Sequence, residues 1–179
     1  MFRKLKNSEL KRATIEEFKN STKLPIAIVL DNVRSQHNIG STFRTSDAFA
    51  IEKVVLCGIC ATPPSAEIRK AALGAEESMS WEYYMHTTEA IQKLKEEGYT
   101  IIAVEQTENS QMLDNFTPTA GQKYAFIFGN EVKGVAQNVI DLSDSTIEIP
   151  QYGTKHSLNI SVSVGVVLWE VTKKRASKI

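Results

Sequence analysis

The sequence predicts an α/β protein with a mostly parallel sheet and helices on both of its faces. Short apolar segments alternate along the chain with amphipathic ones, as strands and helices do in such a fold. The apolar segments are continuous runs of Val, Ile and Leu, which is typical of strands covered on both faces. At 179 residues and 42% hydrophobic composition, the chain is long enough for one domain with its own core.

Five strands are predicted from the apolar runs, and a sixth from a weaker pattern. The first run, PIAIVL, is a buried strand by composition, and the others resemble it. The predicted strands cover residues 25–30, 51–58, 99–106, 123–129 and 145–150, with the weak sixth strand near 81–84.

Helical patterns lie between these runs. The helix predicted over 88–97 stops at Gly98, a residue that commonly ends helices. The last helix, predicted over 157–173, takes Ser157 as its N-cap and is apolar along most of its length. The remaining predicted helices cover 8–19 with Ser8 as N-cap, 38–49, and 65–73.

The chain divides into a basic, helical N-terminal extension, residues 1–23, and a single domain over 24–179. The net charge is zero, which argues mildly against a nucleic-acid binder, but both ends are locally basic (FRKLKNSELKR and KKRASKI). The N-terminus lacks the apolar segment of a signal peptide, and no run reaches the ~20 apolar residues of a membrane span. We therefore expect a cytoplasmic protein that does not associate with membranes.

Cys57 and Cys60 form a C-x-x-C pair, which can indicate zinc binding or redox chemistry. No second Cys or His pair has ligand spacing, and two prolines follow closely where a redox motif would open a helix. We therefore interpret the pair as two reduced thiols at the end of a buried strand, and expect no metal.

The ends of three predicted strands carry polar motifs, and ligands of open parallel sheets bind beyond such ends. In the first motif, NIGSTFRTSDAF, Asn38 is a candidate N-cap and Gly40 lets a backbone or a ligand approach the first helical turn. Arg44 points to the flank of this helix, and a helix start with a nearby cation suits a phosphate. The alternative is that Arg44 pairs with Asp47 on a solvated face.

The second motif, FIFGNEVKGV, contains Gly129 and Glu131, and matches neither a P-loop nor a dinucleotide-binding fingerprint. It could also be a simple turn with a solvated Glu131. The third motif runs from IEIPQYG to SLNISV and places Asn159 in the first turn of the last helix, where backbone N–H groups are unpaired. The alternative there is a capped core helix.

Taken together, the three motifs resemble those of the SpoU (TrmH-like) branch of the SPOUT superfamily, the RNA 2′-O-ribose methyltransferases. NIGSTFRTSDAF is similar to N-x-G-x-x-x-R-T-x-x-A-F, FGNEVKG to F-G-x-E-x-x-G, and IPQYG…SLNISV to I-P-x-x-G…S-L-N-x-S-V. The motifs stand in family order over residues 31–171, nearly the whole chain.

This resemblance implies a SPOUT-type fold with a deep C-terminal trefoil knot, a homodimer, and S-adenosylmethionine held in a bent shape by the second and third motifs. It implies methylation of a ribose 2′-hydroxyl in structured RNA, without a metal. The residue roles that it implies are catalysis by Arg44, Asn38, Glu131 and Asn159, and cofactor binding at Val104, Gly129, Ile149, Ser157 and Leu158.

The sequence departs from the family pattern at two positions. Gln151 stands where Met is common, which would change the wall of the cofactor pocket. Ala50 replaces a Gly; if this position is left-handed, Ala is disfavoured there by roughly 1 kcal/mol.

A compact chain with basic ends favours tRNA over rRNA as the substrate, because many rRNA-directed relatives carry an added RNA-binding domain. Two alternatives remain. One is an RNA-binding or assembly module that keeps the fold without catalysis, and the other is a different S-adenosylmethionine or nucleotide binder that does not act on RNA.

Overall fold

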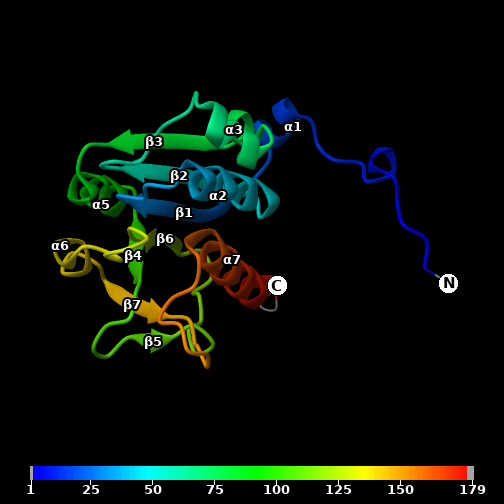
Figure 1. Cartoon of the computed structure of the whole chain (residues 1–179). Coiled ribbons are helices and arrows are strands. Elements are labelled where there is room, and N and C mark those ends of the chain that lie inside the picture. Colours follow the sequence, from blue (N-terminus) through cyan, green and yellow to red (C-terminus); the bar gives the residue numbers. More distant parts are fainter. Residues whose placement is uncertain (1, 177–179) are drawn as a thin grey trace.

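A single seven-stranded parallel sheet forms the centre of the molecule in a computed structural model that describes residues 2–176 (Figure 1). The strand order is β3-β2-β1-β6-β4-β7-β5, and every pairing is parallel, so the predicted α/β class with a mostly parallel sheet is confirmed. The strands are β1 (Leu24–Asp31), β2 (Ile51–Cys57), β3 (Ser80–Tyr84), β4 (Tyr99–Val104), β5 (Gln111–Met112), β6 (Lys123–Phe128) and β7 (Ser145–Glu148).

All six predicted strands are present, including the weak one, which is β3. The two-residue β5 was not predicted, because Gln111 and Met112 are polar or exposed and form no apolar run. Its register with β7 fixes it at the edge of the sheet.

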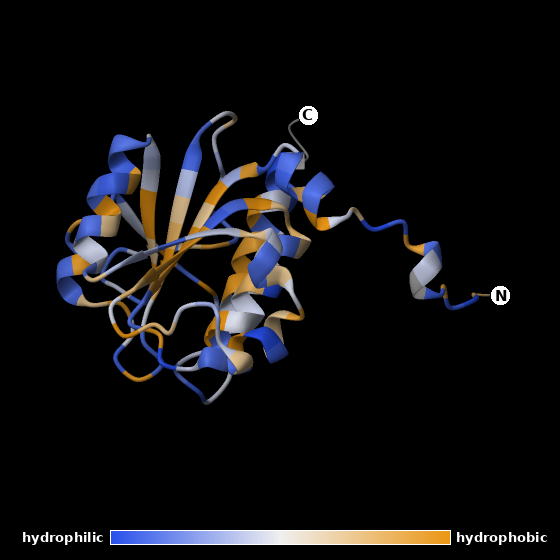
Figure 2. Cartoon of the chain, turned by 90° about the horizontal axis from the view of Figure 1, so that it is seen from above, coloured by the Kyte–Doolittle hydropathy of each residue, from blue (hydrophilic) through white to orange (hydrophobic). Residues whose placement is uncertain are grey.

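Helices cover both faces of the sheet and close two separate cores (Figure 2). Alternate residues of β1 show why: Ile26, Ile28 and Leu30 belong to one core, while Ala27 and Val29 belong to the other. The first core includes residues of α2 (Gln36–Ala48), α3 (Ala66–Ala72), α4 (Ala75–Ser78) and α7 (Ile160–Ala176), and the second includes residues of α5 (Thr87–Glu96) and α6 (Gln137–Ile140).

The start of α2 differs from the prediction. Ser35 is the N-cap, because its side chain accepts a hydrogen bond from the Asn38 N–H, and the helix begins at Gln36. Asn38 therefore lies inside the first turn and is buried rather than capping the helix. Its side chain is free for other partners, as described below.

The start of α7 also differs from the prediction. The helix begins at Ile160 rather than at Ser157, and the Asn159 side chain accepts a hydrogen bond from the Ser161 N–H at 2.9 Å. Ser157 and Leu158 therefore belong to the preceding loop, which matters for the pocket described below.

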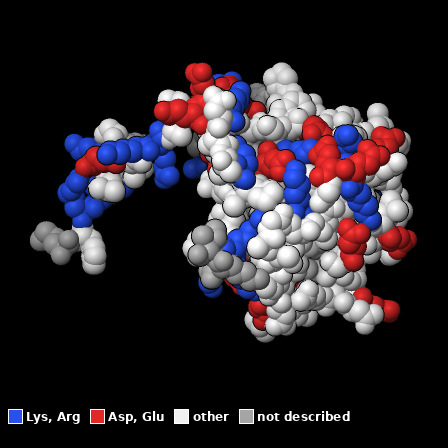
Figure 3. All heavy atoms as spheres, turned by 180° about the vertical axis from the view of Figure 1, so that it is seen from behind, with Lys and Arg blue, Asp and Glu red and all other residues white. Residues whose placement is uncertain are grey.

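The N-terminal extension is less helical than predicted. Instead of one helix over 8–19, it contains a 3-10 turn, η1 (Asn7–Glu9), and the short α1 (Ile15–Asn20). Thr14 and Glu17 form a reciprocal capping box. The N-cap of α1 is therefore Thr14, six residues after the predicted N-cap Ser8. Residues 2–6 and 10–13 form an extended arm that leaves the domain (Figure 1) and carries many of the Lys and Arg side chains of the face in Figure 3.

Further expectations concern individual features. Ala50 has φ 48°, so the position at which the family pattern has Gly is left-handed here. Cys57 and Cys60 are free and buried, and burial raises their pKa values to about 12 and about 11, as expected of inert thiols.

Among the described residues, no group of three or more metal-binding side chains occurs. None of the helices in residues 2–176 has the length and apolarity needed to cross a bilayer.

Candidate active site

The three polar motifs meet at one edge of the sheet. They follow β1, β6 and β7, and the carboxyl ends of parallel strands lie at the same edge. Since β6 pairs with β1, the loop after Phe128 lies directly beside the turn that leads into α2. Residues about a hundred positions apart in the sequence are therefore in hydrogen-bond contact.

Glu131 joins the second motif to the first. Its carboxylate accepts hydrogen bonds from the backbone N–H groups of Arg34 at 3.1 Å and Ser35 at 3.0 Å, and from the Asn38 amide at 3.1 Å. Partial burial by itself would raise the pKa of Glu131, but these donors outweigh it and lower the pKa below its usual value. Glu131 is thus ionised at neutral pH and holds the turn before α2 in place.

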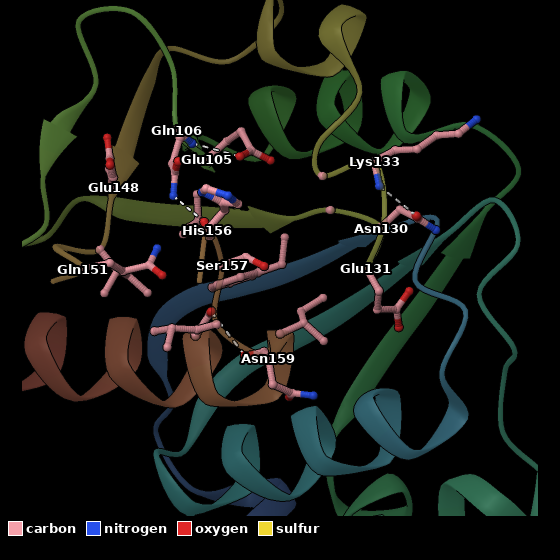
Figure 4. A pocket seen from close by; sticks show the side chains of 18 of the residues that line it. Glu105, Gln106, Asn130, Glu131, Lys133, Glu148, Gln151, His156, Ser157 and Asn159 are labelled. Atoms are coloured by element: carbon pink, nitrogen blue, oxygen red, sulfur yellow. Dashed lines mark hydrogen bonds between the residues drawn. The ribbon is translucent and has the colours of Figure 1, made fainter. Parts of the chain in front are cut away.

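Asn38 joins the first motif to the third. It is 7% exposed, donates its amide hydrogen to Glu131, and accepts from the Asn159 amide at 3.2 Å. The two bonds use opposite ends of the Asn38 amide, so they fix its orientation. The chain Glu131–Asn38–Asn159 links three of the four residues predicted to take part in catalysis. Figure 4 shows its two ends, Glu131 and Asn159.

A pocket of about 540 Å³ opens beside this chain, between the loops after β4, β6 and β7 and the start of α7 (Figure 4). Its wall contains apolar side chains together with loop backbone and several polar groups. The lining includes all five residues predicted to bind cofactor, Val104, Gly129, Ile149, Ser157 and Leu158, as well as Glu131 and Asn159.

Gly129 explains how the pocket wall is built. A Cβ at this position would lie 2.0 Å from the Gly134 carbonyl carbon and 2.1 Å from the Val135 nitrogen, so only glycine permits this approach of two backbone segments. The Asn130 and Gly134 backbones also bond to each other, at 3.0 and 2.8 Å. The loop over 129–134 is therefore a tight hairpin-like turn packed on itself.

Two residues that sequence reasoning missed hold the loops around the pocket. Glu105 accepts from the Val135 N–H at 2.9 Å, and Gln106 donates to the His156 carbonyl at 2.8 Å. Both were assigned to a strand, but β4 ends at Val104 and they belong to the polar edge. Their position directly after an apolar run was the signal that could have identified them.

The pocket fits a ligand with apolar, hydrogen-bonding and charged parts. Leu158 is 41% exposed despite being apolar, and the Ser157 and Leu158 N–H groups donate no hydrogen bond within residues 2–176. Gln151, the departure from the family pattern, is one of the residues that line the pocket wall. An adenosine derivative with an amino-acid chain needs this mixture of contacts.

Arg44 does not line the pocket. It lies on the exposed side of α2, while Ile39 and Phe43 are fully buried on the other side. The alternative pairing with Asp47 does not occur within residues 2–176, where the Asp47 carboxylate instead accepts from the Ser78 hydroxyl at 2.6 Å. Arg44 is therefore solvent-exposed on α2, the helix that also carries Asn38.

An open parallel α/β sheet with a pocket at its carboxyl edge is the arrangement in which α/β domains bind ligands, and sequence comparison identifies the family. Residues 25–169 match the model of the SpoU rRNA Methylase family, so the chain belongs to this family.

Two relatives illustrate its range. The chain is 30% identical over 159 residues to the 23S rRNA (guanosine-2′-O-)-methyltransferase RlmB of Neisseria meningitidis serogroup B, covering 89% of this chain and 62% of the relative. It is also 30% identical to the tRNA (guanosine(18)-2′-O)-methyltransferase of Aquifex aeolicus, over 86% of this chain and 71% of the relative. The chain thus spans roughly two thirds of the length of these curated relatives.

Solved structures share the fold. The crystal structure of the A. aeolicus TrmH/SpoU tRNA modifying enzyme superposes with a TM-score of 0.80 at 23% identity, over 92% of this chain and 82% of that one. The crystal structure of an AdoMet-bound rRNA methyltransferase from Sinorhizobium meliloti superposes with a TM-score of 0.78 at 23% identity. The match covers 87% of this chain and 59% of that one.

Proposed function

We propose that the protein methylates a ribose 2′-hydroxyl of structured RNA with S-adenosylmethionine as methyl donor. The observation that carries this proposal is the Glu131–Asn38–Asn159 chain beside a pocket that contains all five predicted cofactor contacts. Membership in the SpoU family and the names of the relatives, which include both rRNA and tRNA 2′-O-methyltransferases, support the reaction type.

The cofactor would be held by the loops after β6 and β7. The backbone groups of Gly129, Ile149 and Leu158 would contact it, and the exposed Leu158 side chain would cover an apolar part. Bound S-adenosylmethionine supplies a methyl group that is already activated as part of a sulfonium. Alignment of that group with the acceptor oxygen can account for several kcal/mol of the barrier.

Arg44 would act on the RNA. An arginine stays protonated below about pH 12, so a cationic Arg44 would hold the adjacent phosphate and stabilise the oxyanion that develops at the 2′-oxygen. The family resemblance implies instead that Arg44 is the general base that removes the proton of the 2′-hydroxyl. That role would require a neutral guanidinium. Either way, Glu131 and Asn38 fix the start of α2 and so position Arg44.

We further infer that the active protein is a homodimer. Arg44 lies outside the pocket of its own chain, so a partner's pocket would complete the site. The exposed side of α7 is apolar, with Val162 51%, Val166 36% and Trp169 62% exposed, and α7 packs beside α2. A symmetric contact through these two helices would bring Arg44 to the partner's cofactor.

The loops that form the pocket would also form a trefoil knot, as the family resemblance implies. The domain would span residues 24–179, with residues 1–23 as a separate RNA-contacting extension.

We favour tRNA over rRNA as the substrate, acted on in the cytoplasm. The basic arm is the part of the extension that would touch the RNA backbone (Figure 3). Relatives of both substrate types match equally well, at 30% identity, so the preference depends on the basic arm.

Methyl transfer tests the function directly. The purified protein is incubated with methyl-labelled S-adenosylmethionine and either bulk tRNA or bulk rRNA, and nuclease digests are analysed for 2′-O-methylated nucleotides. Label in a 2′-O-methylated nucleotide, more from tRNA than from rRNA, supports the full proposal. Cofactor and RNA binding without transfer would instead support the inactive binding module, and absence of cofactor binding at millimolar concentration would reject the pocket assignment.

A further inference from the structure

Asn130 connects the loop after β6 to the turn after β1. Its amide nitrogen donates a hydrogen bond to the Asn32 carbonyl oxygen at 2.8 Å, across 98 positions of the sequence. Its amide oxygen accepts from the backbone N–H groups of Val132 at 3.0 Å and Lys133 at 3.2 Å. Because the nitrogen faces an acceptor and the oxygen faces two donors, these partners fix the orientation of the amide. The family pattern F-G-x-E-x-x-G leaves the Asn130 position open, and the resemblance gives it no role.

The backbone pairing between β1 and β6 stops just before this contact. The two strands run in parallel register up to the pair of Leu30 with Phe128. Asn32 and Asn130 each lie two residues beyond that pair, and Asn32 turns its chain away with φ 56°. The Asn130 side chain therefore continues the connection between the two chain segments where their backbone ladder has ended.

Asn130 and Glu131 hold opposite ends of one short turn, the segment that leads from β1 into α2 (Figure 4). Glu131 accepts from the N–H groups of Arg34 and Ser35, while Asn130 donates to the carbonyl group of Asn32. A turn held at one point can pivot about it, whereas two contacts of opposite polarity at separate points resist rotation. Both side chains leave the tight loop described above, so the clamp has a rigid base.

The bond to Asn32 distinguishes this arrangement from an ordinary loop turn. An Asn side chain that only shapes its own loop uses its oxygen, as Asn130 does towards Val132 and Lys133. Such a turn does not require the amide nitrogen to reach a different strand. Here the nitrogen does so, and it reaches the strand whose following turn binds Glu131.

We propose that Asn130 is a positioning residue of the methyl transfer, which holds the turn before α2 against the Glu131 carboxylate through its bond to Asn32. The direction in which α2 presents Arg44 then depends on Asn130, although Asn130 touches neither the acceptor oxygen nor the methyl group. This inference rests on the proposed function.

The first test is the Glu131 carboxyl, titrated by side-chain carbon NMR in the full chain without RNA or cofactor, with Glu131→Gln to assign the resonance. In the wild type, burial acts to raise the pKa of Glu131, but the N–H donors of the turn outweigh it and lower the pKa below its usual value. In Asn130→Ala the turn is free to move away from the carboxylate, so the pKa should rise towards its ordinary value. An unchanged pKa would overturn the proposal.

The second test separates the donor of the Asn130 amide from its acceptor. Asn130→Asp keeps an acceptor for Val132 and Lys133 but has no hydrogen for the Asn32 carbonyl oxygen. Asn130→Asp and Asn130→Ala should each lower kcat at least about tenfold, because small displacements of a reacting group are costly. Thermal unfolding checks that both variants fold. A wild-type kcat in Asn130→Asp would overturn the proposal.

Cofactor affinity distinguishes positioning from a direct effect on the pocket, because Asn130 is also one of the pocket-lining residues. The dissociation constant of S-adenosylhomocysteine, measured by calorimetry, should change by less than about threefold in both variants. Weaker cofactor binding with an unchanged kcat would place the role of Asn130 in the pocket and overturn the proposal. Asn138→Ala and Asn138→Asp, at an exposed position of α6, are the matched controls and should stay within about twofold of the wild-type rate.

A double substitution shows whether Asn130 acts through Glu131. In a Glu131→Gln background, Asn130→Ala should lower kcat by less than about threefold, because the carboxylate that it serves is already lost. An undiminished tenfold loss in that background would mean that Asn130 acts independently and would overturn the proposal. A wild type that transfers no methyl group would reject the proposed function instead, and the titration of Glu131 would still decide whether Asn130 positions the turn.

Discussion

At the residue scale, the site depends on a few polar contacts that connect distant parts of the chain. Asn38 bonds to a residue 93 positions later and to another 121 positions later, and each bond uses a different atom of one amide. Such a buried amide has little freedom to rotate without losing a partner. The orientation of α2, and with it the direction of Arg44, is therefore tied to the two loops that form the pocket.

Arg44 gives the sharpest test of the proposed chemistry. Arg44→Ala should lower methyl transfer by at least about 100-fold, the loss typical of removing one group that stabilises an oxyanion. Cofactor binding should be unchanged, because the proposed cofactor contacts come from the loops after β6 and β7 and not from Arg44. The measurements are single-turnover methyl transfer and calorimetry with S-adenosylhomocysteine.

Arg44→Lys separates two versions of that role. Lys keeps the charge but loses the planar fork, so a bidentate clamp predicts activity near that of Arg44→Ala. If charge alone matters, Lys should recover a large share of the rate. A wild-type rate in Arg44→Ala would contradict both versions and would leave Arg44 as a solvated surface residue.

Glu131 makes stability depend on pH. Its folded-state pKa lies below the unfolded value, so its contribution to stability is complete above the unfolded pKa and is lost as the pH falls through the folded pKa. At pH 7, Glu131→Gln should lower the free energy of unfolding by about 1 kcal/mol, because charged acceptor contacts to Arg34 and Ser35 are weakened.

The difference between Glu131→Gln and wild type should shrink as the pH falls into the range where the wild-type carboxyl is protonated. Urea unfolding at neutral and acidic pH measures it, with exposed Glu89→Gln as the control that should show no such trend. A difference that is constant with pH would mean that the carboxylate charge does not hold the turn before α2.

At the element scale, the packing of α2 depends on the absence of a side chain. A Cβ on Gly40 would lie 2.4 Å from the Ile68 carbonyl oxygen and 2.8 Å from the Ala71 Cβ, both in α3. The sequence left open whether this glycine admits a backbone or a ligand, and the answer is a neighbouring helix. α2 thus lies between α3 on one side and α7 on the other.

Gly40→Ala should therefore destabilise the fold, by about 1–3 kcal/mol, because the two helices must separate. Gly165→Ala in α7 is the contrasting substitution. The nearest atom to its added Cβ is Thr45 Cγ2 at 4.0 Å, so we expect a gain of about 0.5–1 kcal/mol from helix propensity. Equal effects of the two substitutions in urea unfolding would contradict this account of the packing between α2 and α3.

At the scale of the whole molecule, the question is how one chain completes its site. In the proposed dimer, α7 buries its apolar side against the partner, and each pocket receives Arg44 from the other chain. The exposed Val162, Val166 and Trp169 lie at helical spacing on this side. An unpartnered helix with such a surface would be unusual in a monomer.

Val166→Asp should convert the dimer to a monomer and reduce methyl transfer at least in proportion, because a buried unpaired charge is unfavourable at an interface. Sedimentation at micromolar concentration measures the state. Leu142→Asp, which places the same charge at another partly exposed apolar position, should leave the dimer intact. A wild-type protein that sediments as a monomer would overturn the dimer.

A mixing experiment tests the shared site itself. Arg44→Ala subunits mixed with Leu158→Arg subunits, which are designed to block the cofactor pocket, should recover part of the activity that each variant lacks alone. Recovery requires that one chain supplies Arg44 and the other supplies the pocket. No recovery in a mixture shown to contain heterodimers would place Arg44 and the cofactor in the same subunit.

The sequence alone determined the order and type of the main elements and the grouping of the polar motifs at strand ends. This is because a local run of apolar residues, such as PIAIVL, predicts a buried strand, and the local spacing of apolar residues, as in α2, predicts a helix. It also placed Val104, Gly129, Ile149, Ser157 and Leu158 in one group, through a family resemblance rather than through local physics. The roles of these residues and of Arg44 stay predictions.

Only the tertiary structure decided which polar groups meet. Ser35 rather than Asn38 caps α2, since Asn38 is taken by partners from two distant loops that no local rule contains. The prediction of one continuous helix from residue 8 was wrong, because the capping box formed by Thr14 and Glu17 starts the helix at Ile15 instead of after Ser8.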